Sequence, residues 1–285
     1  MKALIVNADD FGLAESINRG IIKGYKDGFI TSTSLMCSAP AFKDAVALAQ
    51  AHPGLGVGIH LTLVGGVAPV LPPEQVPTLV DDQGVFPENY VLFAKKLYTG
   101  GIKLPEVKAE LTAQIGRGLA TGLHFTHLDS HQHLHVLPGV SSVVLQLCRE
   151  YKFKAVRVPG EAYLWSGGFD GGLVRTLGKC GLTFCASLFR RQLSAYGLVA
   201  PDHFFGMLAG GHLDERLVGN ILEALPDGVS EIMTHPGLDA AELARKFTWG
   251  YHWEQELQAF LAPANKDKLA ANKIQLMNFG GLTNA

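Results

Sequence analysis

Acidic and imidazole side chains follow several of the short apolar segments in this sequence. They are Asp9 and Asp10, His60, the cluster HLDSHQHLH at residues 127–135, and His235. Carboxylate and imidazole groups ligate divalent metals, and they are also the usual acids and bases of hydrolysis. Their types therefore indicate a metal site, an acid–base site or both, provided that the fold brings them together.

Asp9 and Asp10 form an adjacent pair of carboxylates. Two negative charges this close destabilise each other unless a positive group lies nearby. A bound cation would resolve this, because one carboxylate can ligate it while the other acts on the attacking water. The alternative is a helix N-cap, in which an Asp accepts backbone N–H groups at the start of the next helix. The pair taken alone does not decide between the two.

The segment at residues 127–135 holds four histidines and one aspartate. In an extended chain His131, His133 and His135 would share a face, whereas in a helix His127 and His131 would do so. Either arrangement can present two nitrogens to one ion. Imidazole with carboxylate suits zinc, iron or manganese, and oxygen-rich sites suit magnesium. The cluster predicts metal or catalytic use, but its spacing leaves the members interchangeable.

His60 and His235 are isolated histidines in or after apolar runs. A buried imidazole such as His60 needs a metal, an acid or a carbonyl as partner, because a missing partner costs roughly 1–3 kcal/mol. His235 precedes Pro236, which keeps the backbone extended. Since imidazole titrates near neutrality, His235 is a candidate general acid for a leaving group. The remaining histidines are expected on the surface or in loops: His52, His124, His203, His212 and His252.

The segments that must position these residues alternate between strand-like and helix-like patterns. The expected strands cover residues 2–6, 32–37, 56–63, 125–128, 155–158, 181–187, 229–234 and 274–278. The expected helices cover residues 14–26, 41–51, 105–118, 139–151, 169–180, 216–225 and 253–260. Such alternation predicts βαβ units and a parallel sheet. The carboxyl ends of parallel strands meet at one edge, where ligands bind.

The rest of the chain gives no sign of a second domain. Residues 65–88 are rich in Pro, Gly and Asp and are expected to form a long loop, of the kind that is usually functional or disordered. No internal repeat or linker is present. We therefore expect a single catalytic domain over residues 1–285 with an α/β, (β/α) barrel-like fold, and leave open an incomplete or distorted barrel.

Composition excludes several classes of protein. The chain is 47% hydrophobic and 18% charged, with a net charge of −2, which is typical of globular proteins and shows no footprint for nucleic acid. There is no apolar stretch of ~18–20 residues for a transmembrane segment, and the start resembles a strand more than a signal peptide, so a cytoplasmic location is expected. The four cysteines lack CxxC spacing and are expected as reduced thiols. Without GxSxG, a P-loop or GxGxxG, a serine hydrolase or nucleotide enzyme has no support.

The sequence resembles the YdjC-like carbohydrate deacetylase family in segments spread from the first strand to about residue 236. They are VNADDFG at 6–12, TSTSL at 31–35, GIHL at 58–61, THLDSHQH at 126–133 and HP at 235–236. The resemblance implies a (β/α) barrel-like fold and an enzyme that hydrolyses an N-acetyl group from an amino sugar. It also implies one divalent metal ion, Mg²⁺ first and Zn²⁺ as the alternative.

By matched position, the resemblance implies that Asp10, His60 and His131 ligate the metal. It implies that Asp9 is the general base that takes a proton from the attacking water, and that His235 protonates or orients a group in the site. We add four candidate substrate-binding residues: His127, Asp129, His133 and Arg157.

A narrower resemblance concerns the substrate. Residues 69–81 (PVLPPEQVPTLVD) and 156–161 (VRVPGE) resemble the hopanoid-biosynthesis-associated branch of the family. This implies an N-acetylglucosaminyl lipid in place of a soluble chito-oligosaccharide, and with it membrane association. An apolar mouth for a lipid is expected from one of two groups: Phe204, Phe205 and Met207, or Phe247, Trp249 and Trp253.

Two other functions stay open: a metal-dependent phosphoester hydrolase, and a non-catalytic metal-stabilised carbohydrate-binding protein. The sequence also leaves open the metal's identity, the exact acetylated substrate and whether the chain forms a homodimer.

Overall fold

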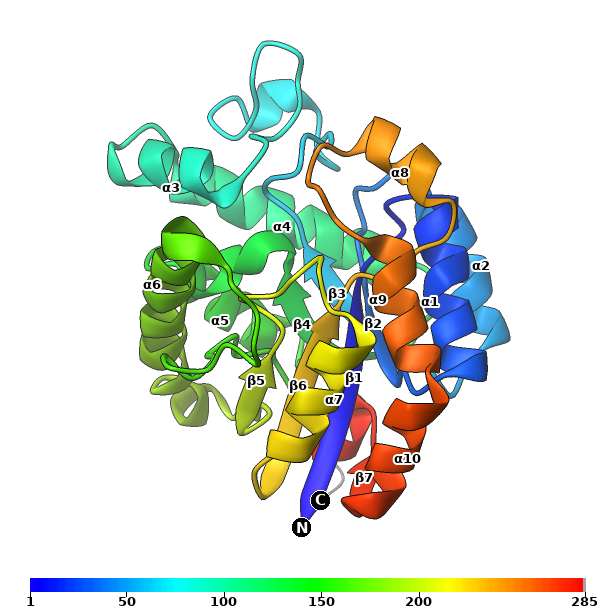
Figure 1. Ribbon diagram of the computed structural model, residues 1–285. Coiled ribbons are helices and arrows are strands. Elements are labelled where there is room, and N and C mark those ends of the chain that lie inside the picture. The colour runs from blue at the N-terminus through cyan, green and yellow to red at the C-terminus, as the bar shows by residue number, and fades with distance from the viewer. Residues whose placement is uncertain (284–285) are drawn as a thin grey trace.

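The computed structural model describes residues 1–283, and at its centre lies a sheet of parallel strands (Figure 1). The strands are β1 (Lys2–Phe11), β2 (Ser32–Leu35), β3 (Gly56–Leu61), β4 (Phe125–Ser130), β5 (His203–Phe205), β6 (Gly228–Thr234) and β7 (Ile274–Leu276). Their order is β4-β3-β2-β1-β6-β5, and β7 pairs with the first residues of β1. All of these pairings are parallel. The fold is a single α/β domain with a curled half-barrel sheet, in agreement with the barrel-like fold expected from the sequence.

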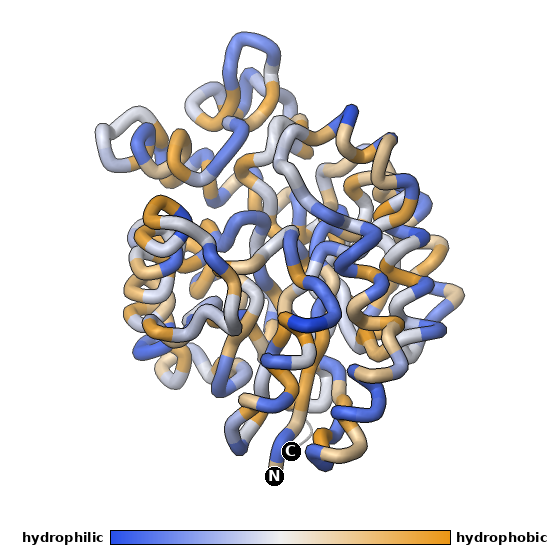
Figure 2. The backbone as a smooth tube through the Cα atoms, in the orientation of Figure 1, coloured by the Kyte–Doolittle hydropathy of each residue, from blue (hydrophilic) through white to orange (hydrophobic). Residues whose placement is uncertain are grey.

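Helices surround this sheet (Figure 1). They are α1 (Glu15–Asp27), α2 (Phe42–Ala51), α3 (Tyr90–Tyr98), α4 (Leu104–Leu119), α5 (Val140–Glu150), α6 (Gly172–Arg190), α7 (Glu215–Ala224), α8 (Ala240–Lys246), α9 (Trp253–Leu261) and α10 (Pro263–Ala271). Short 3-10 turns are η1 (Pro73–Gln75), η2 (His131–Val136), η3 (Leu193–Tyr196) and η4 (Phe279–Thr283). Nine of the ten residues of β1 are buried, as expected for a parallel strand that is covered on both faces. In Figure 2 the central strands carry long apolar stretches, whereas apolar and polar residues alternate along the surrounding helices.

Two single bridges link the outer edges of the sheet. Leu128 in β4 pairs with Val156, and Ala155 pairs with Val199, just before β5. Residues 155–157 therefore cross the opening between β4 and β5. This crossing puts Arg157 within reach of carboxylates from three strands, as described below.

One predicted strand is wrong. Residues 181–187, expected as a strand after a helix at 169–180, belong to the single helix α6. The buried residues of α6 recur at helical spacing, at Lys179, Leu182, Thr183, Ala186 and Phe189, and this burial overrides the local β-like composition. The sequence patterns also missed α3, α8, α10 and β5, which are short elements of three to nine residues.

The expected loop at residues 65–88 is held in place by carboxylates of α4. Glu110 is fully buried and accepts the backbone N–H groups of Val70 and Leu71 at 2.8 and 3.0 Å. Glu106 accepts both the N–H and the hydroxyl of Thr78 at 2.8 Å. The loop is thus fixed at its middle, beside the carboxyl ends of the strands.

The described chain carries four free cysteines, as expected. Across residues 1–283, no helix combines the length and apolar character that a bilayer span needs.

Candidate active site

The site begins at an irregularity near the end of β1. The register between β1 and β2 shifts between Ala8 and Phe11, and Asp10 lies in this shift with a left-handed φ of +65°. In a regular strand, consecutive side chains point to opposite faces. Here both Asp9 and Asp10 approach the same atom, Nε2 of His60, at 4.0 and 3.5 Å. The irregular backbone therefore directs two adjacent carboxylates into one site.

Asp10, His60 and His131 form a buried group at this point, which we call the metal group. Oδ1 of Asp10 lies 2.9 Å from Nδ1 of His131, and the candidate ligand atoms of the three residues lie within 4.8 Å of one another. Oδ2 of Asp10 and Nε2 of His60 lack a hydrogen-bond partner among the described residues, and Oδ1 of Asp10 has only its close contact with Nδ1 of His131. Buried polar atoms that converge with so few bonds are costly unless a cation lies between them. The group could bind a divalent metal ion, because one carboxylate and two imidazoles form a suitable donor set.

The helix N-cap hypothesis for the Asp pair is wrong. Helix α1 begins after Ala14, and its N-terminus has no side-chain cap. Burial raises the pKa of Asp10, but His131 and His60 outweigh it and hold this pKa well below its ordinary value. Asp10 is therefore an ionised carboxylate, the form that a metal ligand requires.

Asp129 orients His60. Nδ1 of His60 lies 2.8 Å from Oδ1 of Asp129, and because a carboxylate only accepts, Nδ1 carries the hydrogen. Nε2 is then directed at Asp10, as in the carboxylate–histidine pairs that support metal ligands. Burial lowers the pKa of His60, but Asp129 and Asp9 outweigh it and raise this pKa to about 10. Without a metal, a proton on His60 thus compensates the carboxylates, and a metal ion would displace it.

Arg157 binds three buried carboxylates beneath this group. Its Nη1 and Nη2 donate to the two oxygens of Asp9 at 2.7 Å, and its Nε donates to Glu231 at 2.8 Å. Nη1 also lies 2.9 Å from Oδ2 of Asp129. The bidentate pair fixes the plane of the Asp9 carboxylate, which Asn7 also contacts through an N–H at 2.8 Å.

This guanidinium helps to distinguish between two possible metal groups. A second convergent set consists of Asp9, His60 and Asp129. Both of its carboxylates are already paired with the positive charge of Arg157, whereas no Arg or Lys pairs with Asp10 within the described chain. The electrostatics therefore favour Asp10, His60 and His131 as the metal ligands.

The histidines after β4 point to different places. Gln132 and His133 have left-handed φ values of +51° and +60°, so the segment is neither the extended chain nor the helix considered from the sequence. His131 joins the metal group, and His133 lines a cavity with its Nδ1 unpartnered. Nε2 of His135 lies 3.0 Å from the carbonyl oxygen of Arg157, so this histidine supports the arginine.

His127 lies in the buried layer behind the site. Its Nε2 is 3.2 Å from the Ser34 hydroxyl, its Nδ1 is 3.0 Å from the Thr126 hydroxyl, and its ring stacks on Phe279 at 3.7 Å. Burial lowers the pKa of His127 to about 3. The fold fully buries three of the four candidate substrate-binding residues: His127, Asp129 and Arg157. Their positions suit a role in supporting the site rather than contact with the substrate.

We expect His127→Phe to make the unfolding free energy less sensitive to acid. The folded pKa of His127 lies below the ordinary 6.5, so neutral His127 stabilises the fold above that pH. This contribution is lost as the pH falls toward 3, because the unfolded state binds the proton first. Between about pH 7 and about pH 5, the wild type should lose about 2 kcal/mol more than the variant. Urea unfolding at the two pH values measures the difference, and equal losses would contradict a neutral buried imidazole.

A cavity of about 200 Å³ opens beside the metal group. Asp9, His131, His133, His235, Met207 and Tyr251 are among the residues that line it. Candidate base, candidate acid and one candidate ligand thus share a space that a reacting group could enter. Asp10 and His60 lie behind this wall and are buried.

Glu256 positions His235 at the cavity. One of its oxygens accepts the backbone N–H of His235 and the hydroxyl of Thr234. Nδ1 of His235 is 3.8 Å from that oxygen and has no hydrogen-bond partner among the described residues. The ring lies 4.8 Å from the ring of Tyr251. Because His235 also lines the cavity, its imidazole is a candidate to exchange a proton with a group there.

Sequence reasoning missed Glu231 and Glu256. Glu231 is the one acid in the β6 sequence GVSEIMT, and Glu256 is fully buried in α9. An acid inside an apolar strand is rarely buried without a partner, so the position of Glu231 in the sequence indicates that a cationic side chain is buried beside it.

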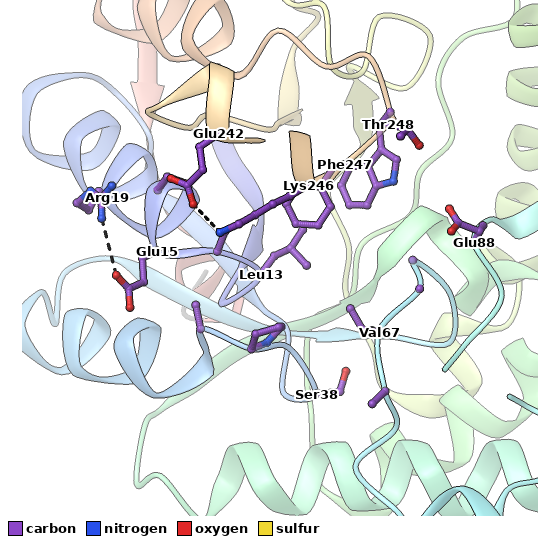
Figure 3. Close-up of a pocket in the computed structure, with 18 residues that line it drawn as sticks. Leu13, Glu15, Arg19, Ser38, Val67, Glu88, Glu242, Lys246, Phe247 and Thr248 are labelled. Atoms are coloured by element: carbon purple, nitrogen blue, oxygen red, sulfur yellow. Dashed lines mark hydrogen bonds and ion pairs between the residues drawn. The ribbon is translucent and has the colours of Figure 1, made fainter. Parts of the chain in front are cut away.

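A second cavity of about 910 Å³ is lined by Trp249 and by residues of α1 and α8 (Figure 3). Phe247, Glu88 and Ser38 also line it. The ring of Trp249 is 5.4 Å from the ring of His131 and 5.5 Å from that of Tyr251. Trp249, which lines the larger cavity, therefore lies next to two residues that line the smaller one, His131 and Tyr251.

The expected apolar mouth is divided between the two cavities. Met207 lines the smaller one, and Phe247 and Trp249 line the larger one. The other three candidates are buried core residues: Phe204, Phe205 and Trp253.

Comparisons with known proteins match nearly the whole chain to relatives of one kind. The family model described as YdjC-like protein matches residues 3–271. A protein from Brevibacillus brevis named carbohydrate deacetylase is 37% identical over 283 residues, which cover 98% of this chain and 99% of the relative. One of the same name from Clostridium beijerinckii is 40% identical over 278 residues, covering 97% and 98%.

A solved structure shares the fold. It is the crystal structure of a protein from Enterococcus faecalis V583, provisionally named for cellobiose-phosphate cleavage, with a TM-score of 0.80 and 27% identity. The alignment covers 99% of this chain and 98% of that one. On the family match and these relatives, the chain belongs to the YdjC-like protein family.

Proposed function

We propose that this chain is a divalent-metal-dependent carbohydrate N-deacetylase. The observation that carries it is the convergence of three buried side chains, Asp10, His60 and His131, on one point beside a cavity that Asp9 lines. Relatives named carbohydrate deacetylase support the reaction class. An ion in this group would polarise the acetyl carbonyl and lower the pKa of the attacking water. Mg²⁺ is the first candidate and Zn²⁺, which suits two imidazoles, is the alternative.

The chain's own residues divide the proton transfers. Asp9, oriented by Arg157 and Asn7, takes the proton from the attacking water. His235, on the same cavity, gives a proton to the departing amine. We assign His133 a contact with the substrate, because it lines the same cavity and its Nδ1 has no hydrogen-bond partner among the described residues. Burial and Arg157 lower the pKa of His133 well below its ordinary value, so this imidazole is neutral.

The substrate that we propose carries an N-acetylglucosamine unit, in a chito-oligosaccharide or in an N-acetylglucosaminyl lipid such as a hopanoid. The smaller cavity would take the acetylated unit beside Asp9. The larger cavity, which Trp249 lines next to His131, offers room for the remainder of the molecule.

The arrangement of positive charge argues against a phosphoester hydrolase. Such enzymes usually use two metals about 4 Å apart. Here the second group of candidate ligands already holds the guanidinium of Arg157, which leaves one group for one ion.

Acetate release tests the proposed function. The purified chain is incubated with chitobiose bearing N-acetyl groups, with an N-acetylglucosaminyl lipid and with a phosphorylated sugar, before and after chelation. We expect acetate from at least one acetylated substrate, loss of activity on chelation and recovery with added metal. Metal binding without any turnover would favour a binding protein, and phosphate release would favour a phosphoesterase.

We expect His60→Ala and His131→Ala each to weaken metal affinity by more than about 100-fold, because each removes a ligand atom rather than a supporting contact. Calorimetric titration with Mn²⁺ measures this without reference to catalysis. His52→Ala is the matched control, because His52 lies before the amino end of β3, whereas His60 lies near its carboxyl end, and its ring bonds to the carbonyl oxygen of Leu48 in α2. Unchanged affinity in both ligand variants would refute this ligand set.

A further inference from the structure

Exposed apolar side chains are concentrated on α3, α6 and the segment that precedes α6. Of fourteen large apolar residues that are exposed in the described chain, nine fall within residues 90–98 and 163–184. We call these nine residues the α3–α6 surface: Val91, Leu92, Tyr98, Tyr163, Leu164, Leu173, Val174, Leu177 and Phe184. Isolated exposed apolar residues are ordinary, but a concentration of this kind marks an interaction site.

The outer side of α6 is as apolar as its inner side. Leu182 and Phe189 are buried against the domain, whereas Leu173, Leu177 and Phe184 are 74%, 62% and 57% exposed. The exposed residues recur at helical spacing and so form one stripe. Packing within the domain accounts for the inner side only, and the outer stripe lacks a partner among the described residues.

The three segments form one continuous surface. Tyr90, at the start of α3, packs against Gly178 of α6. The hydroxyl of Tyr90 is so close that a Cβ atom added to Gly178 would lie only 2.7 Å from it. Nζ of Lys179 donates to the carbonyls at both ends of residues 163–165, at 2.9 and 2.8 Å, which holds the fully exposed Leu164 beside α6. Figure 1 shows α3 and α6 on the same side of the molecule.

The charge of these helices has one sign. Helix α3 contains Lys95 and Lys96, α6 contains Arg175, Lys179 and Arg190, and neither contains an Asp or Glu. Lys95 is exposed and Lys96 half-buried, whereas Lys179 is buried and Arg175 and Arg190 donate to backbone carbonyls of the domain. The segment before α6 carries one exposed acid, Asp170. Apolar side chains flanked by basic ones are typical of helices that lie in the interface of an anionic membrane. A symmetric contact with a second copy would instead place these like charges opposite one another.

We propose that the α3–α6 surface docks onto an anionic lipid bilayer. Its aliphatic and aromatic side chains enter the boundary between headgroups and acyl chains, and Lys95 and Lys96 pair with anionic headgroups. Tyr90 of α3 and Leu182 of α6 also line the smaller cavity. The smaller cavity thus lies directly behind this surface, and docking holds it close to the lipid, where a substrate unit attached to a lipid could reach it.

Vesicle co-sedimentation of the full chain tests the surface. Vesicles contain phosphatidylcholine alone or with about a third phosphatidylglycerol, which provides the anionic surface. We expect binding to the anionic vesicles that weakens with salt, and weaker binding to neutral ones. The double variant Val174→Glu/Leu177→Glu should bind at least about tenfold more weakly, because it loses apolar contact and adds repulsion. Leu119→Glu, at a site that is 41% exposed on α4, should bind like the wild type.

Lys95→Gln/Lys96→Gln should weaken binding to the anionic vesicles alone by about tenfold. None of these substituted residues lines either cavity described above, so acetate release from a soluble acetylated chitobiose should be unchanged, which separates the surface from the proposed reaction. Equal vesicle binding by Val174→Glu/Leu177→Glu and Leu119→Glu would overturn the proposal. So would a concentration-dependent dimer that only Val174→Glu/Leu177→Glu abolishes, since the surface would then join two copies.

Discussion

Replacing Asp9 by Asn should lower kcat for acetate release by roughly a thousandfold while the metal stays bound. The amide has the size of the carboxylate but cannot take a proton from water. Asp10, and not Asp9, belongs to the unpartnered group that favours the ion, so metal affinity should change little. Steady-state acetate release and Mn²⁺ titration on the same preparation measure both quantities.

Asp82→Asn provides the matched control, because Asp82 is an exposed carboxylate in the loop at residues 65–88. It should leave both rate and affinity unchanged. An Asp9→Asn enzyme with wild-type kcat would refute the role of Asp9 as base. An inactive variant that had also lost its metal would instead place Asp9 among the ligands.

Replacing Arg157 by Met should lower the free energy of unfolding by roughly 3–5 kcal/mol. The variant leaves the carboxylates of Asp9, Asp129 and Glu231 buried without the guanidinium that now pairs with them. Arg157→Lys should recover little, because an ammonium cannot reproduce the bidentate contact with Asp9 together with the Nε contact to Glu231. Chemical unfolding of the metal-free proteins measures these differences.

The same variant distinguishes a supporting arginine from one that binds substrate. Arg191→Met, which changes an exposed arginine just after α6, should leave stability unchanged. If Arg157 bound substrate directly, its replacement would raise KM and leave the unfolding free energy near that of the wild type. That result would contradict the charge arrangement described here.

Much of the site was predictable because its members occupy the ends of strands. Asp9 and Asp10 lie near the end of β1, His60 near the end of β3, His131 just after β4 and His235 just after β6. Parallel strands bring these ends to one edge, so apolar runs followed by polar residues were enough to predict a common site. Choosing His131 from its cluster was different: it depended on the family resemblance.

The undetected parts depend on tertiary contacts that no local pattern records. The burial of Arg157 follows from the bridges that residues 155–157 make between β4 and Val199. The left-handed backbone at Asp10 and His133 decides where their side chains point, and neither residue type requires it. The composition of residues 181–187 suits a helix or a strand, and the sequence therefore predicts a strand where α6 continues. Only the burial pattern of α6 distinguishes the two structures.

Anomalous diffraction from crystals grown with Mn²⁺ tests the metal ligands most directly. We expect one peak within about 2.0–2.3 Å of ligand atoms from Asp10, His60 and His131, with Asp9 paired to Arg157 beside it. A peak between Asp9 and Asp129, or two peaks about 4 Å apart as in two-metal hydrolases, would contradict it.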